Sequence, residues 1–195
     1  MQHVLTDHAS NIETYVYWED AFTDIELNWL QHKARSNIKP GLTGYGTSYV
    51  ENSDLRRSSV GWISCSDETR WVYNKLGHVV SSLNASFFRF DLAGFGEDLQ
   101  LSNYDSCKLG TYGWHVDFAP NSPSRKLSIV MQLTDPSEYE GGDLQILDHG
   151  GQPINIPKKR GLIAAFPSWT IHQVTQVTSG SRQSLVSWIT GPMFK

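Results

Sequence analysis

The residues best suited to chemistry lie in one short segment, Tyr112-Gly113-Trp114-His115-Val116-Asp117. We predict that this segment is a β-strand, in which alternate side chains point to opposite faces, so His115 and Asp117 share one face. Gly113 falls on the same face and leaves room beside them. An imidazole and a carboxylate are two of the three ligands of a 2-His-1-carboxylate facial triad, which holds non-haem iron and leaves other metal positions open. Because His-x-Asp is common by chance and a lone His is more often structural than a ligand, the third ligand has to be found independently.

The third ligand has to come from the other histidines, and the sequence has seven in all. His172 opens a predicted strand that follows the apolar stretch Leu162–Phe166. The remaining five lie in the N-terminal tail, in predicted helices or in a turn: His3, His8, His32, His78 and His149. We therefore predict a metal site formed by His115, Asp117 and His172.

Arg182 is the residue best placed to bind a carboxylate near that site. It stands ten residues beyond His172, across a turn predicted at Ser179-Gly180. A guanidinium offers a planar two-pronged match to a carboxylate and does not lose its charge. A dicarboxylic co-substrate that chelates the metal at one end needs such a partner at its far end. The competing interpretation is a solvated hairpin residue, which most Arg near a turn are.

The N-terminal part of the chain is predicted to be largely helical. Tyr15–Trp18 is a short predicted strand, and Thr23-Asp24-Ile25-Glu26 is a capping-box signature for a helix that runs to about Arg35. A second helix is predicted from about Asp67 by apolar residues at helical spacing. These residues are Val72, Leu76, Val79, Val80 and Leu83. Between the helices, Lys39–Asn52 is rich in Gly, Thr and Ser and is predicted to be a loop.

After Ala85 the pattern changes to short apolar or alternating segments separated by turn residues. The predicted strands are Phe87–Leu92, Leu99–Tyr104, Tyr112–Val116, Leu127–Leu133, Leu144–Leu147, Ile154–Ile156, Leu162–Phe166, His172–Val177 and Ser184–Ile189. This order predicts a mainly β fold, a double-stranded β-helix or jelly roll, with N-terminal helices packed on one sheet. We expect a single domain over residues 1–195, with helical support at about 20–85 and the jelly-roll core at about 86–190.

The composition excludes several classes of function. The net charge is −4 and no basic stripe with interleaved aromatics occurs, so we expect no nucleic-acid partner. No apolar run is long enough for a membrane span, and no signal peptide is recognisable, so we expect a cytoplasmic protein. Cys65 and Cys107 have no CxxC spacing and are predicted to be free thiols. The sequence gives no indication of an oligomeric state.

The combined motifs resemble one known family, the 2-oxoglutarate/iron(II) dioxygenases of the prolyl-4-hydroxylase-like group, in particular the bacterial PKHD-type hydroxylases. The resemblance runs from about Tyr15 to Ile189 and depends on the order and spacing of several modest motifs. These are Tyr112-x-x-His115-x-Asp117, Arg125-Lys126-Leu127-Ser128, Tyr139-Glu140-Gly141-Gly142-Asp143-Leu144, and His172-Gln173-Val174-Thr175 through Arg182.

The resemblance implies residues for the co-substrate. Iron(II) would be held by the predicted triad, and 2-oxoglutarate would chelate it while its far carboxylate meets Arg182. Tyr104 and Tyr112 match aromatic positions that line the co-substrate pocket. Gln132 falls where some members carry a Tyr that helps to bind the distal carboxylate, and this departure leaves its role open. Both tyrosines are equally well explained as core aromatics.

The resemblance also implies residues for the substrate. Arg125 matches a basic residue at the mouth of the site, and Trp188 matches a bulky residue that packs over the co-substrate and reaches toward the substrate. The competing interpretations are a surface charge for Arg125 and a core residue for Trp188. The implied activity is hydroxylation of an unactivated C–H bond with Fe(II), 2-oxoglutarate and O₂, with ascorbate as an optional stimulant. A prolyl residue of a protein is the leading substrate, and a free amino acid or other small metabolite is the alternative.

Two other classes remain as rivals. Gly161, Pro167 and His172 imitate the second half of a cupin signature, but the first half of that signature has two His and a Glu on one strand. In addition, Arg182 has no special task in a cupin-like metal-binding protein. The second rival is a non-catalytic jelly-roll module with a vestigial site, against which the intact triad argues. An iron- and 2-oxoglutarate-dependent succinate assay would separate all three classes.

Overall fold

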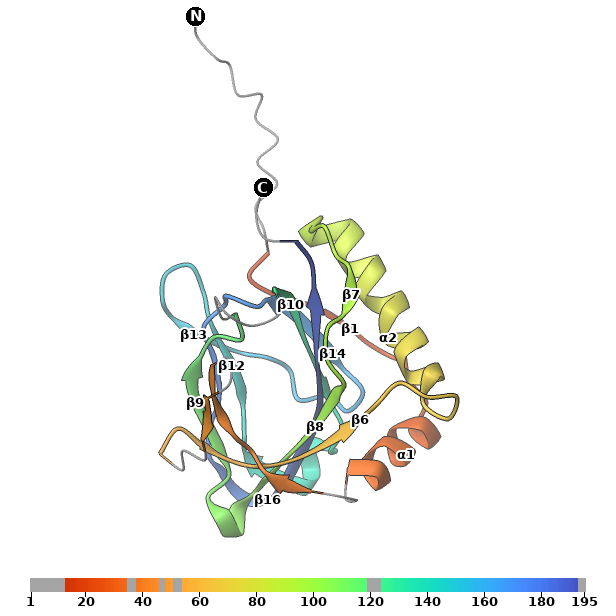
Figure 1. Ribbon diagram of the computed structural model, residues 1–195. Coiled ribbons are helices and arrows are strands. Elements are labelled where there is room, and N and C mark those ends of the chain that lie inside the picture. The colour runs from red at the N-terminus through yellow and green to blue at the C-terminus, as the bar shows by residue number, and fades with distance from the viewer. Residues whose placement is uncertain (1–12, 35–37, 46–47, 51–53, 119–123, 193–195) are drawn as a thin grey trace, which may run out of the picture.

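Two facing β-sheets and two α-helices form the computed structural model, which describes residues 13–34, 38–45, 48–50, 54–118 and 124–192. The helices cover the outer side of the larger sheet, and the smaller sheet lies against its other side (Figure 1). This is the predicted mainly β jelly roll with N-terminal helices on one sheet. In the part of the chain that the structure describes, no helix is long and apolar enough to cross a membrane.

The larger sheet has nine strands, all paired antiparallel. In spatial order its main path is β1 (Val16–Trp18), β14 (Ile163–Pro167), β10 (Arg125–Gln132), β16 (Val177–Thr190), β8 (Leu99–Asp105), β6 (Ser59–Ile63) and β2 (Lys39–Pro40), with β7 (Gly94–Phe95) and β11 (Tyr139–Gly141) also paired to β16. The smaller sheet has the order β13 (Pro153–Asn155), β12 (Leu144–Leu147), β15 (His172–Val174), β9 (Thr111–His115) and β5 (Arg56–Arg57). Strands β3 (Thr43–Tyr45) and β4 (Ser48–Val50) pair separately. The short helices are η1 (Asn84–Phe88), η2 (Ser106–Lys108) and η3 (Pro136–Glu138).

Both predicted α-helices are confirmed. Helix α1 (Asp24–Ala34) begins with the predicted capping box: the Thr23 backbone N–H donates to Glu26 Oε2 at 2.8 Å, and the Glu26 N–H donates to Thr23 Oγ1 at 3.4 Å. Helix α2 (Arg70–Leu83) starts a few residues after the predicted position and buries all five predicted apolar residues. Because that apolar stripe must leave water, α2 packs on the sheet.

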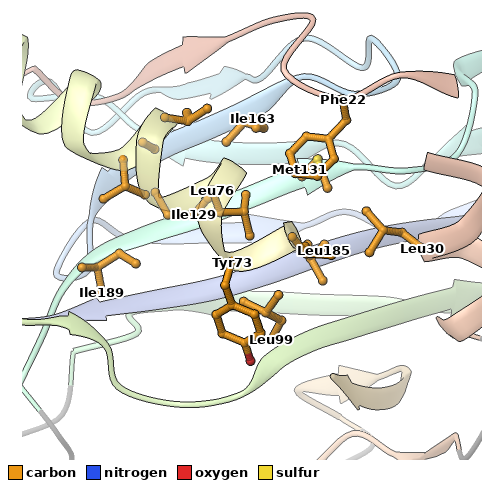
Figure 2. Packing of buried hydrophobic residues seen from close by; sticks show 14 of the residues in the cluster. Phe22, Leu30, Tyr73, Leu76, Leu99, Ile129, Met131, Ile163, Leu185 and Ile189 are labelled. Atoms are coloured by element: carbon orange, nitrogen blue, oxygen red, sulfur yellow. The ribbon is translucent and has the colours of Figure 1, made fainter. Parts of the chain in front are cut away.

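Alternate residues of the central strands are divided between the two faces of the larger sheet. On β10, Ile129 and Met131 join the hydrophobic cluster under the helices. Val130, between them, joins a second cluster between the sheets. Figure 2 shows the first cluster, in which side chains from the sheet lie with Leu30 and Leu76 of the helices. Both faces of β10 are therefore buried, but against different partners.

The prediction of a strand at Phe87–Leu92 is wrong. Residues Asn84–Phe88 form a π-helical turn that continues α2, and Arg89 has a left-handed φ of 55°. The Asn84 side chain donates to Phe90 O and accepts from Phe90 N, both at 2.9 Å. This side-chain bridge satisfies backbone groups that a strand partner would otherwise bond.

Two further predictions differ from the structure. The region 39–52 was predicted as a loop, but its described residues include the short strands β2, β3 and β4; residues 46–47 and 51–52 lie outside the described residues. The predicted turn at Ser179-Gly180 is also wrong, because β16 runs without interruption from Val177 to Thr190. Gly180 has a φ of 70°, and a Cβ there would lie 2.1 Å from Glu138 O, at the end of η3 just before β11. The glycine therefore permits close packing within a strand rather than a change of chain direction.

Candidate active site

The three predicted metal ligands are brought together at the ends of two neighbouring strands. His115 ends β9 and His172 begins β15, and the two residues are direct partners in the ladder. Asp117 follows β9 by two residues, and its oxygens lie 3.8 Å from His115 Nε2 and 3.5 Å from His172 Nε2. One ligand atom from each residue lies within 4.8 Å of the others. Among the described residues, no other group of three His, Cys, Asp or Glu side chains is gathered in this way.

A register shift in β9 modifies the predicted alternation. The pairing with β15 shifts between His172 and Val174, so both Tyr112 and His115 point into the cavity. Their rings stack at 3.6 Å between centroids with planes 13° apart. Gly113 faces elsewhere: a Cβ there would lie 3.2 Å from Leu55 Cδ1. Simple alternation predicts that Gly113 leaves room beside the metal site. This prediction is wrong, because Gly113 faces Leu55.

Both histidines are oriented so that Nε2 can bind a metal. His115 Nδ1 lies 2.8 Å from Gly113 O and His172 Nδ1 lies 2.9 Å from Thr170 O. A carbonyl oxygen only accepts, so each Nδ1 carries the proton and each Nε2 keeps its lone pair in the neutral ring. The two Nε2 atoms are also the atoms that face Asp117. The backbone thus orients both imidazoles before any ion binds.

Asp117 is held from two sides. Its Oδ2 accepts a hydrogen bond of 2.7 Å from Ser128 Oγ, which lies 3.0 Å from Ser168 Oγ. The backbone N–H groups of Asp117 and Phe118 both donate to Ser168 O at 2.9 Å. Burial raises the pKa of Asp117, but His172, His115, Arg125 and the Ser128 hydroxyl outweigh it and hold that pKa at about 2.

Electrostatics also favours the metal-binding form of His115. Burial, followed by the neighbouring His172, lowers the pKa of His115 to about 3. At neutral pH the ring is therefore uncharged and Asp117 is ionised. Two imidazoles and one carboxylate form the donor set of a non-haem iron(II) site, and their close grouping fits a single divalent ion.

Arg182 lies in the same cavity as the triad and has no anionic partner among the described residues. Its side chain is completely buried, at 0% exposure, and lines a cavity of about 380 Å³ that the triad also lines. Its Nη2 donates to Gln132 Oε1 at 2.9 Å, its Nη1 lies 3.4 Å from Ser184 Oγ, and its Nε has no partner. A buried guanidinium without a counter-ion is costly, so this geometry fits a ligand with a carboxylate.

Comparison with known proteins identifies this arrangement. A family model described as the 2OG-Fe(II) oxygenase superfamily matches residues 99–190, which contain the triad and Arg182. A PKHD-type hydroxylase of Synechococcus sp. (strain CC9311) is 46% identical over 83 residues, which cover 42% of this chain and 37% of that protein. One from Prochlorococcus marinus is 44% identical over 86 residues, covering 43% and 38%. The chain thus matches well under half of the length of these relatives.

Solved structures show the same fold over nearly the whole chain. A Pseudomonas putida prolyl-4-hydroxylase superposes with a TM-score of 0.73 at 16% identity, covering 92% of this chain and 94% of that one. A Trichoplax adhaerens prolyl hydroxylase in complex with a hypoxia inducible factor peptide fragment has a TM-score of 0.74 at 16% identity, covering 92% and 84%. These similarities show that the shared fold extends beyond the segment that the family model matches.

The predicted co-substrate residues occupy two different positions. Tyr104 and Tyr112 line the cavity, and the Tyr104 ring lies 5.5 Å from the Arg182 guanidinium across the β8–β16 pair. Gln132 does not line the cavity; it lies behind Arg182 and accepts its hydrogen bond. Gln132 therefore contacts the guanidinium directly through its Oε1, and its buried Nε2 has no hydrogen-bond partner in the described part of the chain.

The predicted substrate residues lie together at another part of the cavity wall. The Arg125 guanidinium stacks 3.9 Å above the Trp188 ring. It makes two hydrogen bonds with Glu97, at 2.7 and 2.8 Å, and a third with Asp117 O at 3.3 Å. Arg125 is therefore held in place by Glu97, a residue that no sequence pattern singled out.

Two more cavity residues were missed because they lie on strands that were not predicted. Arg56 belongs to β5, and Trp62 belongs to β6 with its ring 6.4 Å from that of Trp188. The alternation at Val60 and Trp62, with Gly61 between them, is a signal that favours a strand at β6. No comparable signal marks the two-residue strand β5, because pairing with β9 alone defines it.

Proposed function

We propose that the protein is an Fe(II)- and 2-oxoglutarate-dependent dioxygenase that hydroxylates an unactivated C–H bond. The observation that carries this proposal is a single cavity lined both by the metal triad and by buried Arg182, which has no anionic partner in the described part of the chain. One group binds the metal and the other binds the far carboxylate of a dicarboxylic co-substrate. A cupin-like protein needs the first group but has no use for the second.

When bound, iron(II) with 2-oxoglutarate and O₂ would supply the oxidising chemistry: one oxygen atom enters the substrate as hydroxyl, the other enters succinate, and CO₂ is released. His115, Asp117 and His172 would hold the ion on one side and leave its other side open to the cavity. Ser128 fixes the carboxylate of Asp117 through its 2.7 Å hydrogen bond. Arg182, backed by Gln132, would fix the orientation of the co-substrate.

Part of the remaining wall is apolar and would shield the reacting groups from water. Val130, Leu144, Val174, Val186 and Trp188 contribute apolar surface to the cavity. None of these side chains offers an acidic or basic group for proton transfer. The protein's contribution to the reaction is therefore positioning and shielding, which suits chemistry supplied by a bound metal and co-substrate.

For the substrate we propose a polypeptide, with proline as the target residue. Arg125 and Trp188 support this choice, because an indole offers a flat apolar wall for a pyrrolidine ring and a guanidinium can donate to a peptide carbonyl. The similar proteins named hydroxylase and prolyl hydroxylase agree with it. The alternative substrate is a free amino acid or another small metabolite.

The class of reaction is tested by succinate formation that requires both iron(II) and 2-oxoglutarate. A cupin-like isomerase or a vestigial module would form no succinate. The substrate is tested by incubating the enzyme with iron(II), ascorbate and 2-oxoglutarate in a lysate from its own source and mapping single-oxygen additions. Hydroxyproline that is absent with Arg125→Ala supports the polypeptide. Succinate driven only by the small-molecule fraction would support the metabolite instead.

A further inference from the structure

Arg56 is a second buried cation on the wall of the same cavity. Its side chain is 7% exposed, its Nε donates to Ser58 Oγ at 2.7 Å, and its Nη1 donates to Leu42 O at 3.2 Å. The guanidinium lies 4.7 Å from the centre of the Tyr112 ring. A Cβ at position 41 would lie 2.7 Å from Arg56 Nε, so Gly41 makes room for this side chain.

The hydrogen bonds of Arg56 leave its charge uncompensated. Both acceptors are neutral, and they use two of the five N–H groups of a guanidinium. Over the described ranges of the chain, no Asp or Glu forms an ion pair with Arg56. Arg125 provides the contrast on the same wall, because Glu97 neutralises it with two hydrogen bonds. Buried cations normally have such a partner, since desolvating an unpaired charge is expensive.

The charges around the cavity indicate the charge of a ligand that would fit it. Four cationic and two acidic side chains line it: Lys39, Arg56, Arg125, Arg182, Glu97 and Asp117. Asp117 belongs to the metal site, Glu97 belongs to Arg125, and Arg182 would meet the doubly negative co-substrate. The charges of Asp117, Glu97, Arg125 and Arg182, together with those of iron(II) and 2-oxoglutarate, sum to zero. The charges of Arg56 and of the exposed Lys39 then remain as excess positive charge.

We propose that Arg56 binds a carboxylate of the substrate, so that the substrate class is a compound or peptide with an acidic group near the hydroxylated carbon. The inference rests on the proposed function and refines its substrate. The spacing follows from stacking: Arg56 lies on Tyr112, which lies on the metal ligand His115. Two ring layers separate the guanidinium from the metal site. The acidic group therefore belongs to the target residue itself or to its immediate neighbour.

The test compares matched probes that differ only in charge, with the protein loaded with manganese(II) and saturating 2-oxoglutarate without O₂. The first set pairs each N-acetyl amino acid with its amide, which represents a free carboxylate. The second pairs acetyl-Ala-Pro-Asp-amide with acetyl-Ala-Pro-Asn-amide, and acetyl-Asp-Pro-Ala-amide with acetyl-Asn-Pro-Ala-amide, which represent an acidic side chain. Calorimetry then gives the affinity of each probe, and the set with the larger effect identifies the source of the carboxylate.

In the wild-type protein, at least one acidic probe should bind about ten- to hundred-fold more tightly than its neutral partner, because a hydrogen bond to a charged group contributes about 1.5–3 kcal/mol. Arg56→Gln should abolish this preference, and Arg56→Lys should retain part of it. Arg57→Gln is the matched control: Arg57 is the next residue of β5, bonds to Leu109 O at 3.0 Å, and does not line the cavity. That variant should behave as the wild type.

The proposal is overturned if no acidic probe binds better than its neutral partner in the wild-type protein, a result that needs no variant to fold. It is also overturned if the preference survives in Arg56→Gln. A third contrary outcome is a loss of 2-oxoglutarate affinity in Arg56→Gln as large as that in Arg182→Ala, which would assign Arg56 to the co-substrate. Failure of the proposed function is distinct, because it appears as absence of iron-dependent succinate whatever the probes do.

Discussion

On strand β10, Leu127, Ile129 and Met131 face the two helices, whereas Ser128, Val130 and Gln132 face the space between the sheets. Strand β16 repeats the division. Leu185 and Ile189 lie under the helices, and the alternate residues line the cavity: Arg182, Ser184, Val186 and Trp188. The helix-facing side is mainly apolar, with the buried hydroxyl of Ser187 as an exception, and it maintains the fold. The cavity-facing side buries hydroxyls, an amide and a guanidinium, which cost stability unless a ligand uses them. Buried polar residues on one face of a sheet thus mark the functional side.

The largest expected effect on function alone comes from removing a metal ligand on the cavity-facing side. His115→Ala and His172→Ala should each lower iron affinity by more than about 100-fold, since changes to groups that only orient ligands already cost about 10- to 100-fold. Turnover should fall with iron content. The denaturation midpoint of the metal-free protein should change little, because both side chains border an existing cavity. Normal iron content and activity in either variant would show that the metal assignment is wrong.

Substitutions on the helix-facing side should instead lower the stability of the fold. Ile129→Ala should lower the free energy of unfolding by about 2–5 kcal/mol, because it opens a space in a packed cluster. Val130→Ala, one residue along, is the control and should cost less because its side chain already borders the cavity. Urea denaturation measures both. Equal losses would show that the two faces do not differ in packing.

Arg182→Ala should separate co-substrate binding from metal binding. The variant should bind iron nearly normally but bind 2-oxoglutarate about ten- to hundred-fold more weakly, through loss of a charge-assisted pair of about 1.5–3 kcal/mol. Calorimetry on the manganese-loaded protein without O₂ measures the change, with Arg57→Ala as the control. Unchanged affinity would mean that another basic residue, such as Arg125 or Lys126, holds the carboxylate.

The smallest predicted effect concerns the pH dependence of stability without metal. The pKa of His115 falls from 6.5 to about 3 on folding, so the unfolded chain binds the proton first as the pH drops. Stability is therefore complete above about pH 6.5 and is lost below it, by up to about 1.4 kcal/mol per pH unit. Asp117, with its pKa of about 2, adds a loss below about pH 4. Urea titrations at pH 7, 6 and 5 should show a slope that His115→Asn reduces; an unchanged slope would contradict this assignment.

Much of the fold and the centre of the candidate site could be predicted from periodicity. The capping box at Thr23 and the helical stripe of α2 are local signals, and both are found in the structure. His115 and Asp117 share a face, as strand alternation requires. The register shift that turns Tyr112 toward the same cavity was not predictable, because it depends on the partner strand.

The residues that were missed depend on contacts between distant parts of the chain. Glu97 matters only because it reaches Arg125, and Arg56 matters only because β5 pairs with β9. Arg182 was placed after a turn because Gly180 is a common turn residue, whereas here its small size permits strand packing. Local patterns report the conformation of a segment, but they do not report which segment will lie beside it.

Strand β16 also limits how this protein can change during evolution. Arg182, Ser184, Val186 and Trp188 all line the cavity, so one strand carries both the proposed co-substrate end and the proposed substrate end of the site. Inserting or deleting one residue between Arg182 and Trp188 would turn one end toward the helices. A new specificity can therefore arise by substitution along this strand, or by changes in β5 and β6, but not by a single-residue change in its length.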